Sequence, residues 1–195
     1  MIFDLQPRLV GDNLSLRPLV RADYEPLYRA ASDPLIWAQH PEPLRWQREI
    51  FDALFERLTG LGGALLVTDQ LSEAVIGVSS YYDHRLDSQD IVIGYTFLTR
   101  PFWGGRYNAE LKLLMLRHAF QFVETVWFHV GKQNTRSQKA MEKIGAQLSH
   151  EMLRESGGVT ASFLHYCVHR HQFPAIAARL TRDKVSETIP LTVKS

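Results

Sequence analysis

The chain has 195 residues, of which 45% are hydrophobic and 22% are charged, and its formal net charge is +1 at pH 7. This is the composition of an ordinary soluble globular domain, and the small net charge gives no reason to expect a nucleic-acid or membrane partner. The single cysteine, Cys167, excludes an intrachain disulfide and fits a reducing cytoplasm. No signal peptide and no apolar run of roughly 20 residues is visible, so we expect a cytoplasmic protein.

The N-terminal third predicts one strand and two helices. Residues 14–19 alternate like a strand, and Asp23 offers a cap for a helix that Asp33-Pro34 breaks. Residues 35–43 read as an irregular loop with an aromatic anchor. A second helix fits about 46–58, because apolar residues recur there at helical spacing, and the glycines that follow end it.

The middle of the chain predicts a hairpin and then a buried strand. Residues 64–69 and 74–82 are two strands joined by a short polar turn. In residues 91–98 both faces are largely apolar, as in a strand inside a sheet. Gly94 in the centre of that strand indicates a bulge, or a close approach of another backbone or a ligand.

A glycine-containing loop, Trp103-Gly-Gly-Arg-Tyr-Asn108, connects this strand to a long and largely apolar helix that reaches about residue 124. Consecutive backbone N–H groups at a helix start, with two glycines allowing close approach, can cradle phosphate oxygens. The alternative is a tight turn in which Asn108 simply caps the helix. The loop lacks the glycine and lysine pattern of the Rossmann and Walker motifs.

The remaining elements complete an α/β chain. Residues 126–130 predict a strand parallel to the central one, and a short helix follows, capped by Asn134 and ended by Gly145. Residues 146–153 and 160–168 look like a closing hairpin. We expect a single domain over residues 1–173 and a partly helical tail over 174–195, whose apolar patch at 176–180 is an interface between two copies or a docked tail.

Two groups of polar and small residues lie where ligands bind in open α/β sheets, at the carboxyl ends of neighbouring parallel strands. They are the glycine loop and the segment that starts at Asn134. Ser137 shares a helix face with Ala140 and Met141, so it points inward with apolar residues. Its hydroxyl is either a local partner of the backbone or a functional group.

With these residues in view, the chain resembles the GNAT N-acetyltransferases, especially the branch of ribosomal-protein N-terminal acetyltransferases. The resemblance covers roughly residues 12–170 and rests on a set of motifs in the right order: LRPL at 16–19, IGYTFL at 93–98, WGGRYNAE at 103–110 and NTRSQKAMEKIG at 134–145. It implies a mixed, mostly antiparallel sheet of six to seven strands, with helices on both faces and a splayed parallel strand pair.

The resemblance also implies acetyl-CoA as co-substrate, an amine as acceptor and no metal. In the implied complex, the main chain of the central strand and Asn134 contact the pantetheine. The loop amides contact the pyrophosphate. These residues are Phe97, Leu98, Trp103, Gly104, Gly105, Arg106, Tyr107, Asn108 and Asn134. Two positions depart from the family pattern, since Arg106 stands where glycine or alanine is usual and Met141 where many relatives have a tyrosine acid.

The chemistry needs few protein groups, because a neutral amine attacks the thioester and the CoA thiolate leaves. A backbone α-amine has a pKa near 8, so roughly a tenth is neutral at pH 7, whereas less than about a thousandth of a lysine is. We therefore expect an N-acetyltransferase acting on a peptide or protein N-terminal α-amine, with Ser137 supplying a proton to the departing sulfur. No general base stands out, although Asp83, His84, Asp87 and His129 lie near the expected acceptor side.

Other interpretations stay open at this stage. The acceptor could be a small amine, such as an amino-glycoside or a polyamine, and Trp37, Trp46 and Phe51 would line its side of the site. The chain could also be a non-catalytic CoA-binding module, which the residues Arg106 and Met141 favour. A metal site is a third alternative, because alternating His165, Cys167 and His169 share one strand face. A homodimer is compatible with the sequence.

Overall fold

The computed structural model describes residues 2–156 and 158–186. Within them it has eight strands: β1 (Leu9–Val10), β2 (Leu14–Pro18), β3 (Ala64–Asp69), β4 (Val75–Arg85), β5 (Asp90–Leu98), β6 (Thr125–Gly131), β7 (Gln147–Ser156) and β8 (Val159–His169). The helices are α1 (Tyr24–Ala31), α2 (Pro34–Trp37), α3 (Arg48–Gly60), α4 (Arg106–Ala119), α5 (Thr135–Ile144) and α6 (Phe173–Ser186).

The strands form one mixed sheet in the order β1-β2-β3-β4-β5-β6-β8-β7, and only the β5–β6 pair is parallel. This confirms the expected α/β class and its mostly antiparallel sheet. The count of six to seven strands is corrected to eight. The additional strand, β1, has two residues, which is too short to show the alternation that reveals a strand in a sequence.

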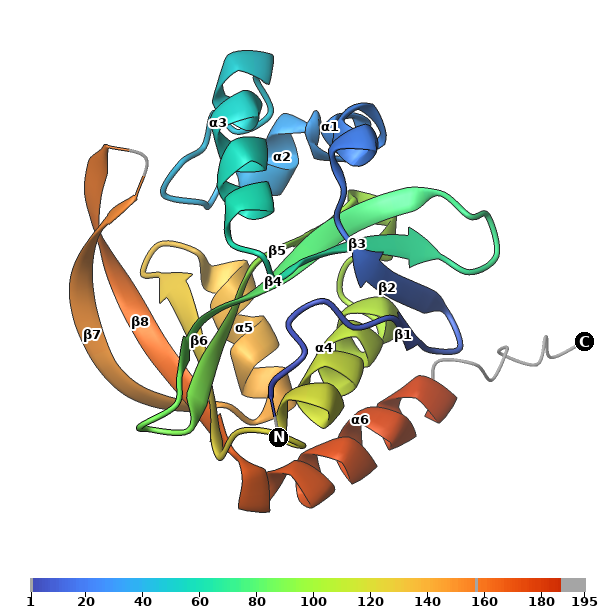
Figure 1. The fold of residues 1–195 in the computed structure, drawn as a ribbon, viewed down its shortest axis with the longest axis vertical. Coiled ribbons are helices and arrows are strands. Elements are labelled where there is room, and N and C mark those ends of the chain that lie inside the picture. Colours follow the sequence, from blue (N-terminus) through green and yellow to red (C-terminus); the bar gives the residue numbers. More distant parts are fainter. Residues whose placement is uncertain (1, 157, 187–195) are drawn as a thin grey trace, which may run out of the picture.

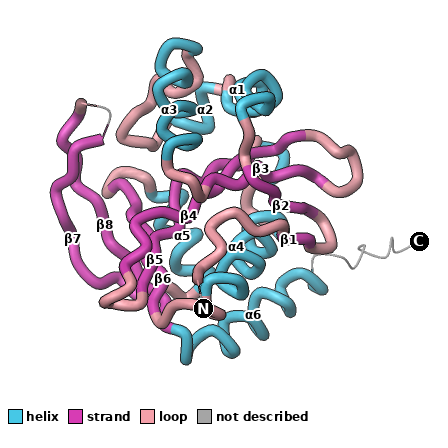
Figure 2. The backbone as a smooth tube through the Cα atoms, viewed as in Figure 1, coloured by secondary structure: helices cyan, strands magenta, loops and turns pink. Residues whose placement is uncertain are grey.

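Helices cover the sheet on both faces, with α1, α2 and α3 on one side and α4, α5 and α6 on the other (Figures 1 and 2). The alternating side chains of β3 show how one sheet holds helices on both faces. Leu65 and Val67 belong to the core under α4 and α6, whereas Ala64 and Leu66 belong to the core under α1 and α3. Side chains of one strand point to opposite faces in turn, so the same strand anchors both helical layers.

The parallel pair separates soon after it begins. Only Asp90–Val92 of β5 pairs with residues 125–127 of β6, and beyond them the two strands are no longer bonded. At Tyr95 the backbone enters the left-handed region (φ 52°), and the β4–β5 register shifts there. This is a bulge of the kind that re-aims side chains next to active sites. The gap between β5 and β6 is the feature around which the site is built.

Gly94 lies next to this bulge, which is one of the two alternatives expected for a glycine within a strand, and the group that approaches it closely is a side chain. A Cβ added at Gly94 would lie 2.8 Å from the ring of Tyr82, a distance that real Cβ atoms do not show. The absence of a side chain at Gly94 therefore lets the Tyr82 ring pack closely against this strand.

A long-range tie fixes the start of α4 to the N-terminal segment. The carboxylate of Glu110, 1% exposed, accepts hydrogen bonds from the backbone N–H groups of Asp12 and Asn13 and, at 2.6 Å, from the Asn13 side-chain amide. Gly11 completes this arrangement, because a Cβ there would lie 2.0 Å from a Glu110 carboxylate oxygen. The second turn of α4 is thereby held in place from 97 residues away in the sequence.

Two predicted boundaries change for identifiable reasons. The expected loop at 35–43 begins with α2, because Asp33 Oδ1 accepts the Leu35 N–H at 3.0 Å and Pro34 fits the first helical position. Helix α4 begins at Arg106 with Gly105 as its N-cap, so the alternative in which Asn108 caps it is wrong.

The apolar patch predicted at 176–180 lies in α6, which packs on α4. Ile176 and Leu180 are buried in the core, and the rings of Phe120 and Phe173 are 5.3 Å apart. Of the two alternatives expected for the patch, the structure therefore shows the docked tail, because the patch packs against α4 of its own chain. The domain boundary at 173/174 and the homodimer stay predictions, and the end of the predicted tail, 187–195, lies outside the described residues.

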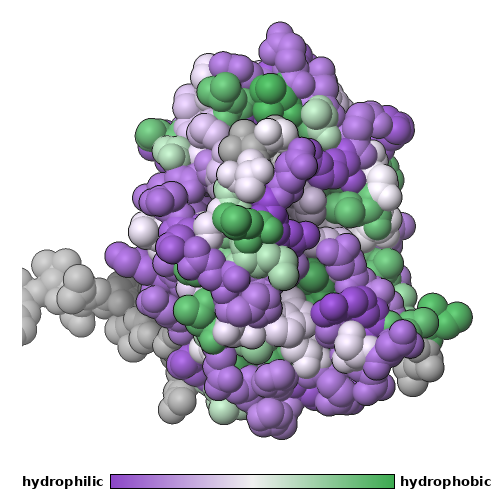
Figure 3. Space-filling model, turned by 90° about the vertical axis from the view of Figure 1, so that its left-hand side faces the viewer, coloured by the Kyte–Doolittle hydropathy of each residue, from purple (hydrophilic) through white to green (hydrophobic). Residues whose placement is uncertain are grey.

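No helix in the described part of the chain is long and apolar enough to span a bilayer. The face drawn in Figure 3 is mostly hydrophilic, and its apolar residues gather in small separate groups rather than in one continuous patch.

Candidate active site

A candidate site is a cavity of about 700 Å³ at the carboxyl end of β5, which we call the outer cavity. Five segments line it: the end of β5 (Thr96, Phe97, Leu98), the glycine loop and the start of α4 (Trp103, Gly104, Gly105, Arg106, Asn108, Ala109), α2 and the residues after it (Ile36, Trp37, Gln39, His40), α5 with its cap (Asn134, Thr135, Arg136, Ser137, Lys139, Ala140, Lys143, Ile144), and Leu180. All the cofactor residues expected from the sequence line it except Tyr107.

The glycine loop presents backbone N–H groups to this cavity. Gly104 has φ 77°, a conformation that other residues rarely adopt, and Gly105 is the N-cap of α4. The first N–H groups of a helix have no partner inside the helix, and the helix dipole makes that end partly positive. A loop of this geometry is suited to binding an anion. Tyr107 does not line the cavity, and its hydroxyl donates to Asp69 Oδ1 at 2.7 Å.

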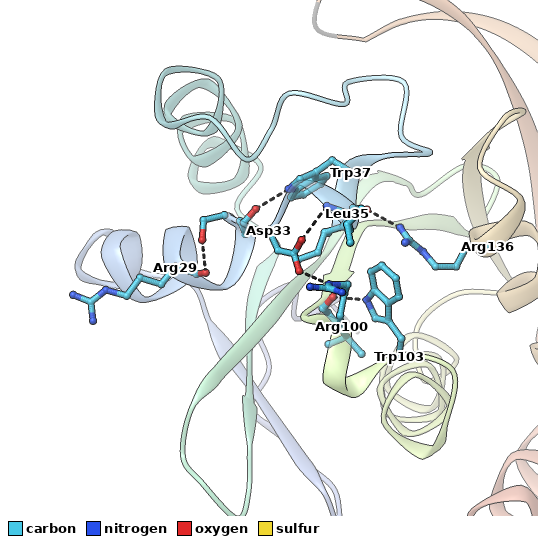
Figure 4. Close-up of polar contacts among 11 residues, drawn as sticks. Arg29, Asp33, Leu35, Trp37, Arg100, Trp103 and Arg136 are labelled. Carbon is cyan, nitrogen blue, oxygen red and sulfur yellow. Dashed lines mark hydrogen bonds and ion pairs between the residues drawn. The ribbon is translucent and has the colours of Figure 1, made fainter.

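Trp103 and Arg136 connect three walls of the outer cavity (Figure 4). The indole N–H of Trp103 donates to Leu98 O at 2.6 Å, which fixes the loop to the end of β5. The Arg136 guanidinium lies over the indole at 3.9 Å from its centroid and donates to Ile36 O at 2.6 Å. Helix α5 is thereby tied to α2 and to the glycine loop at once.

The rim of the outer cavity is cationic. Arg106, Arg136, Lys139 and Lys143 line it, and Lys143 Nζ donates to Gly104 O at 3.2 Å. Among the described lining residues there is no aspartate or glutamate. This charge suits an anionic ligand with several phosphates. Sequence reasoning missed the α5 cations, although Arg136, Lys139 and Lys143 recur at i, i+3 and i+7, one face of a helix.

Asn134 and Ser137 lie at the start of α5, where the outer cavity meets the β5–β6 gap. Asn134 is 6% exposed, and its Oδ1 accepts the Ser137 backbone N–H at 3.1 Å, so it is the predicted cap. The Ser137 hydroxyl is half-buried and has no hydrogen-bond partner within the described residues. The structure therefore gives no support to the alternative in which this hydroxyl only satisfies nearby backbone groups.

A second cavity, of about 140 Å³, lies inside the gap between β5 and β6, and we call it the inner cavity. Seven residues line both cavities, so the two adjoin: Trp37, His40, Thr96, Asn108, Asn134, Ser137 and Ala140. The residues specific to the inner cavity include Arg45, Gly94, Tyr95, Lys112, Phe128, His129, Met141 and Phe163. Here too no acidic side chain is found among the described lining residues.

The residues expected on the acceptor side divide between those that reach the cavities and those that do not. Trp37 lines both cavities and His129 lines the inner one. Asp83, His84, Asp87, Trp46 and Phe51 line neither, and Phe51 is fully buried in the core under α1 and α3. Sequence spacing could not separate these two groups, because which side chains reach the cavities depends on how segments distant in the chain pack together.

Burial sets the charge state of the ionisable groups in the inner cavity. It lowers the pKa of His40 to about 3, with the neighbouring Arg45 charge adding to the effect. It lowers the pKa of His129 to about 3, with His165 and Arg154 contributing, and that of Lys112 to about 7. Both histidines are thus neutral at pH 7, and burial disfavours the charged form of Lys112.

His165 of β8 lies in a row of imidazole rings with His129 of β6 and His150 of β7. His165 stacks on His129 at 4.0 Å between ring centroids and lies 4.6 Å from His150. His169 contacts the Thr125 hydroxyl at 3.0 Å, and burial raises the pKa of the Cys167 thiol. In the described residues no group of three or more His, Cys, Asp or Glu side chains is arranged to hold a metal ion.

Comparison with known proteins agrees with this architecture. The family model described as an acetyltransferase (GNAT) domain matches residues 13–147. A candidate acetyltransferase of known crystal structure is 31% identical, covering 89% of this chain and 91% of its own, with a TM-score of 0.76. A search among curated proteins gives no match.

Two more distant structures share the fold. Mycobacterium smegmatis RimJ, solved with CoA-disulfide, is 18% identical over 87% of this chain and 88% of its own, with a TM-score of 0.66. Spermidine N-acetyltransferase from Vibrio cholerae, solved with CoA and spermine, is 15% identical over 83% of this chain and 98% of its own, with a TM-score of 0.63.

Proposed function

The chain belongs to the GNAT acetyltransferase family and is an N-acetyltransferase, and from that premise we propose that it transfers the acetyl group of acetyl-CoA to a peptide or protein N-terminal α-amine. The observation that carries the proposal is the pair of adjoining cavities at the β5–β6 gap. The outer one is rimmed by cations, and the inner one is small and without acidic residues in its described lining.

The outer cavity is the proposed site of the donor. The amides of residues 104–108 would hold the pyrophosphate, and Arg106 and the α5 cations would neutralise the phosphates. The pantetheine arm would run along Phe97 and Leu98 toward the gap, beside Asn134. Leu98 O already accepts the Trp103 indole N–H, so the arm would pair with the other backbone groups of this strand. The two distant structures of this fold were solved with CoA-disulfide and with CoA, which supports a donor of this chemical class.

The lining of the inner cavity supports an α-amine over a polyamine. A polyamine carries several ammonium groups, and a site that selects it needs carboxylates to balance them, because an unpaired buried charge is costly. The inner cavity instead presents Arg45 and Lys112. An α-amine enters as the neutral species that reacts, and about a tenth of it has this form at pH 7.

Ser137 is the proposed proton donor to the CoA sulfur as the thioester breaks. Its hydroxyl lines both cavities and is not engaged elsewhere in the described structure. Met141, one helical turn further along α5, is 4% exposed and has no proton to give. The CoA thiol should resemble a free cysteine thiol with a pKa near 8.5, so the help required from Ser137 is modest.

Mass spectrometry of an acceptor panel tests the proposal. Peptides with a free N-terminus, the same peptides with a blocked N-terminus and one internal lysine, spermine and an amino-glycoside are incubated with enzyme and acetyl-CoA. We expect acetylation of the free α-amines alone, with a rate that is appreciable at pH 7 and levels off a little above pH 8. Acetylation confined to lysine side chains or to spermine would contradict the proposal.

A further inference from the structure

Lys112 is a buried lysine inside the gap where the proposed reaction takes place. It projects from the second turn of α4, is 3% exposed and lines the inner cavity together with Gly94, Tyr95 and Thr96 of the β5 bulge. Its Nζ donates to Thr96 Oγ1 at 3.1 Å and lies 5.1 Å from the centroid of the Phe128 ring. Thr96 and Phe128 come from the two strands that separate, so Nζ lies between them.

No acidic side chain of the described residues forms an ion pair with Lys112. Its hydrogen-bond partner among the described residues, the Thr96 hydroxyl, is itself 2.7 Å from the Ser79 hydroxyl, and Ser79 is fully buried. A lysine needed only for stability would have a carboxylate partner or would extend its ammonium group to water. Lys112 does neither, which points to a role that uses its amine in the cavity.

Resting on the acetyltransferase function proposed above, we infer that Lys112 is the proton acceptor that takes the proton from the attacking amine. Two independent features support this assignment. The amine group is placed beside the bulged strand along which the thioester would enter, and Thr96 fixes its position. Burial lowers the pKa of Lys112 to about 7, so a large share of it is neutral and can accept a proton at neutral pH.

The step balances without a further reactant. The acceptor nitrogen attacks the thioester carbon, the C–N bond forms, and one proton of that nitrogen moves to neutral Lys112 Nζ. The C–S bond then breaks and the CoA thiolate leaves with the electron pair. The Lys112 ammonium returns the proton to the thiolate, through Ser137 where the hydroxyl bridges them, and the products are the amide and the CoA thiol.

The surroundings of Lys112 allow its titration to be followed on its own. The other ionisable groups of the inner cavity are Tyr95 on β5, His129 on β6, and His40 and Arg45 in the segment before α3. Helix α5 contributes Asn134, Ser137, Ala140 and Met141, which do not titrate near neutral pH. His40 and His129 are neutral above about pH 3, and Arg45 keeps its charge at neutral pH. A change near pH 7 in this cavity therefore belongs to Lys112.

The test compares Lys112→Met with Lys112→Arg. Methionine keeps the stem and cannot accept a proton, whereas arginine keeps a positive charge that it does not lose. With an α-amine substrate we expect kcat to fall at least about 100-fold in both, at unchanged thermal stabilisation by acetyl-CoA. In wild type kcat should rise with pH near pH 7, as Lys112 loses its proton. This rise should vanish in Lys112→Met, and only the rise near pH 8 that the substrate amine causes should remain. The matched control is Lys132→Met, at an exposed lysine paired with Glu151, which should behave as wild type.

Three results would overturn the inference: unchanged kcat and pH profile in Lys112→Met, wild-type turnover in Lys112→Arg, or a Lys112 amine that titrates near 10.5. The last is measured by NMR of lysine-labelled protein, with the signal assigned by its absence in Lys112→Met. This measurement also separates the two proposals. If the wild-type enzyme acetylates no amine of the panel, the proposed function fails, and the titration alone then decides whether a neutral amine occupies the cavity.

Discussion

The outer and inner cavities adjoin through the same seven residues, yet they treat positive charge in opposite ways. In the outer cavity Arg106, Lys139 and Lys143 are exposed, so each keeps its hydration. In the inner cavity Lys112 is buried beside apolar groups, which disfavours its charged form. Lysines in two positions of one site thus have two chemical characters: hydrated cations that attract an anion, and an amine kept ready to exchange a proton.

The stability of Lys112→Met is the most sensitive test of this difference between the two cavities. A lysine whose pKa falls from 10.5 to about 7 on folding opposes folding by at most about 5 kcal/mol. This penalty is complete below pH 7, where the folded protein must also bind the proton. It declines as the pH rises from 7 to 10.5, because in that range only the unfolded chain binds it.

We therefore expect Lys112→Met to be more stable than wild type at pH 6, with a gain that shrinks toward pH 10. Denaturant unfolding at a series of pH values measures this. Lys139→Met, which removes an exposed cation of the outer cavity, should change stability by less than about 0.5 kcal/mol at any pH. A loss of stability in Lys112→Met at all pH values would show that its ammonium group is well accommodated in the fold.

The next largest effect concerns the phosphate cradle of the outer cavity. Gly104→Val forces a β-branched residue into φ 77°, so the loop must rearrange and affinity for acetyl-CoA should fall more than about 100-fold. The thermal shift that acetyl-CoA produces in wild type should then disappear. Pantetheine, which lacks the pyrophosphate, should stabilise the wild-type protein far less than CoA does.

Gly62→Val is the matched control for this substitution. Gly62 also has a positive φ, of 69°, and like Gly104 it has open space where a Cβ would lie, but it lies between α3 and β3, away from the cavities. Both variants should lose similar stability, and only Gly104→Val should lose the acetyl-CoA shift. Equal stabilisation of wild type by pantetheine and CoA would rule out the loop as the phosphate site.

A smaller effect is expected at the boundary between the cavities. Ser137→Ala should lower kcat about tenfold to 100-fold, at or below the lower end of general acid catalysis, because the CoA thiolate is already a tolerable leaving group. Binding of CoA and the melting temperature should change little, and Ser137→Cys should recover part of the rate. A variant with full turnover and a reduced melting temperature would instead show that the hydroxyl serves only the start of α5.

The smallest effect should come from one cation of the rim. Lys143→Ala removes a hydrated charge near the Gly104 carbonyl, and we expect acetyl-CoA affinity to fall only about threefold at physiological salt. The loss should be greater at low ionic strength, where screening is weak. Titration calorimetry at two salt concentrations measures both values, and a salt-independent loss would indicate that Lys143 acts through the loop conformation.

The sequence was informative where the pattern is local. Alternation and helical spacing located the hairpin, the central strand and α5, and Asn134 and Gly145 marked the ends of α5 as the structure has them. The family motifs then indicated the outer cavity, where eight of the nine expected cofactor residues lie in the lining. Those residues are contiguous in short segments, so their neighbourhood in space follows from their neighbourhood in the chain.

The inner cavity could not be predicted in the same way. Lys112 falls in a helix that is apolar on most of its circumference, and the sequence does not tell whether its amine extends to water or enters the gap. The answer depends on where β5 and β6 separate and on the bulge at Tyr95, and both are long-range features. Asp83, His84 and Asp87 were expected near the acceptor, and they lie outside both cavities.

The tie between Glu110 and the N-terminal segment has a consequence for the kinetics of folding. Its partners, Asp12 and Asn13, lie 98 and 97 residues away along the chain, so the bonds form only after β2 and α4 have met. Contacts of such high sequence separation form late, because closing the long loop between them loses much chain entropy. The glycine loop at the start of the same helix should therefore acquire its final shape in the last phase of refolding, and the capacity to bind CoA should appear after most of the secondary structure.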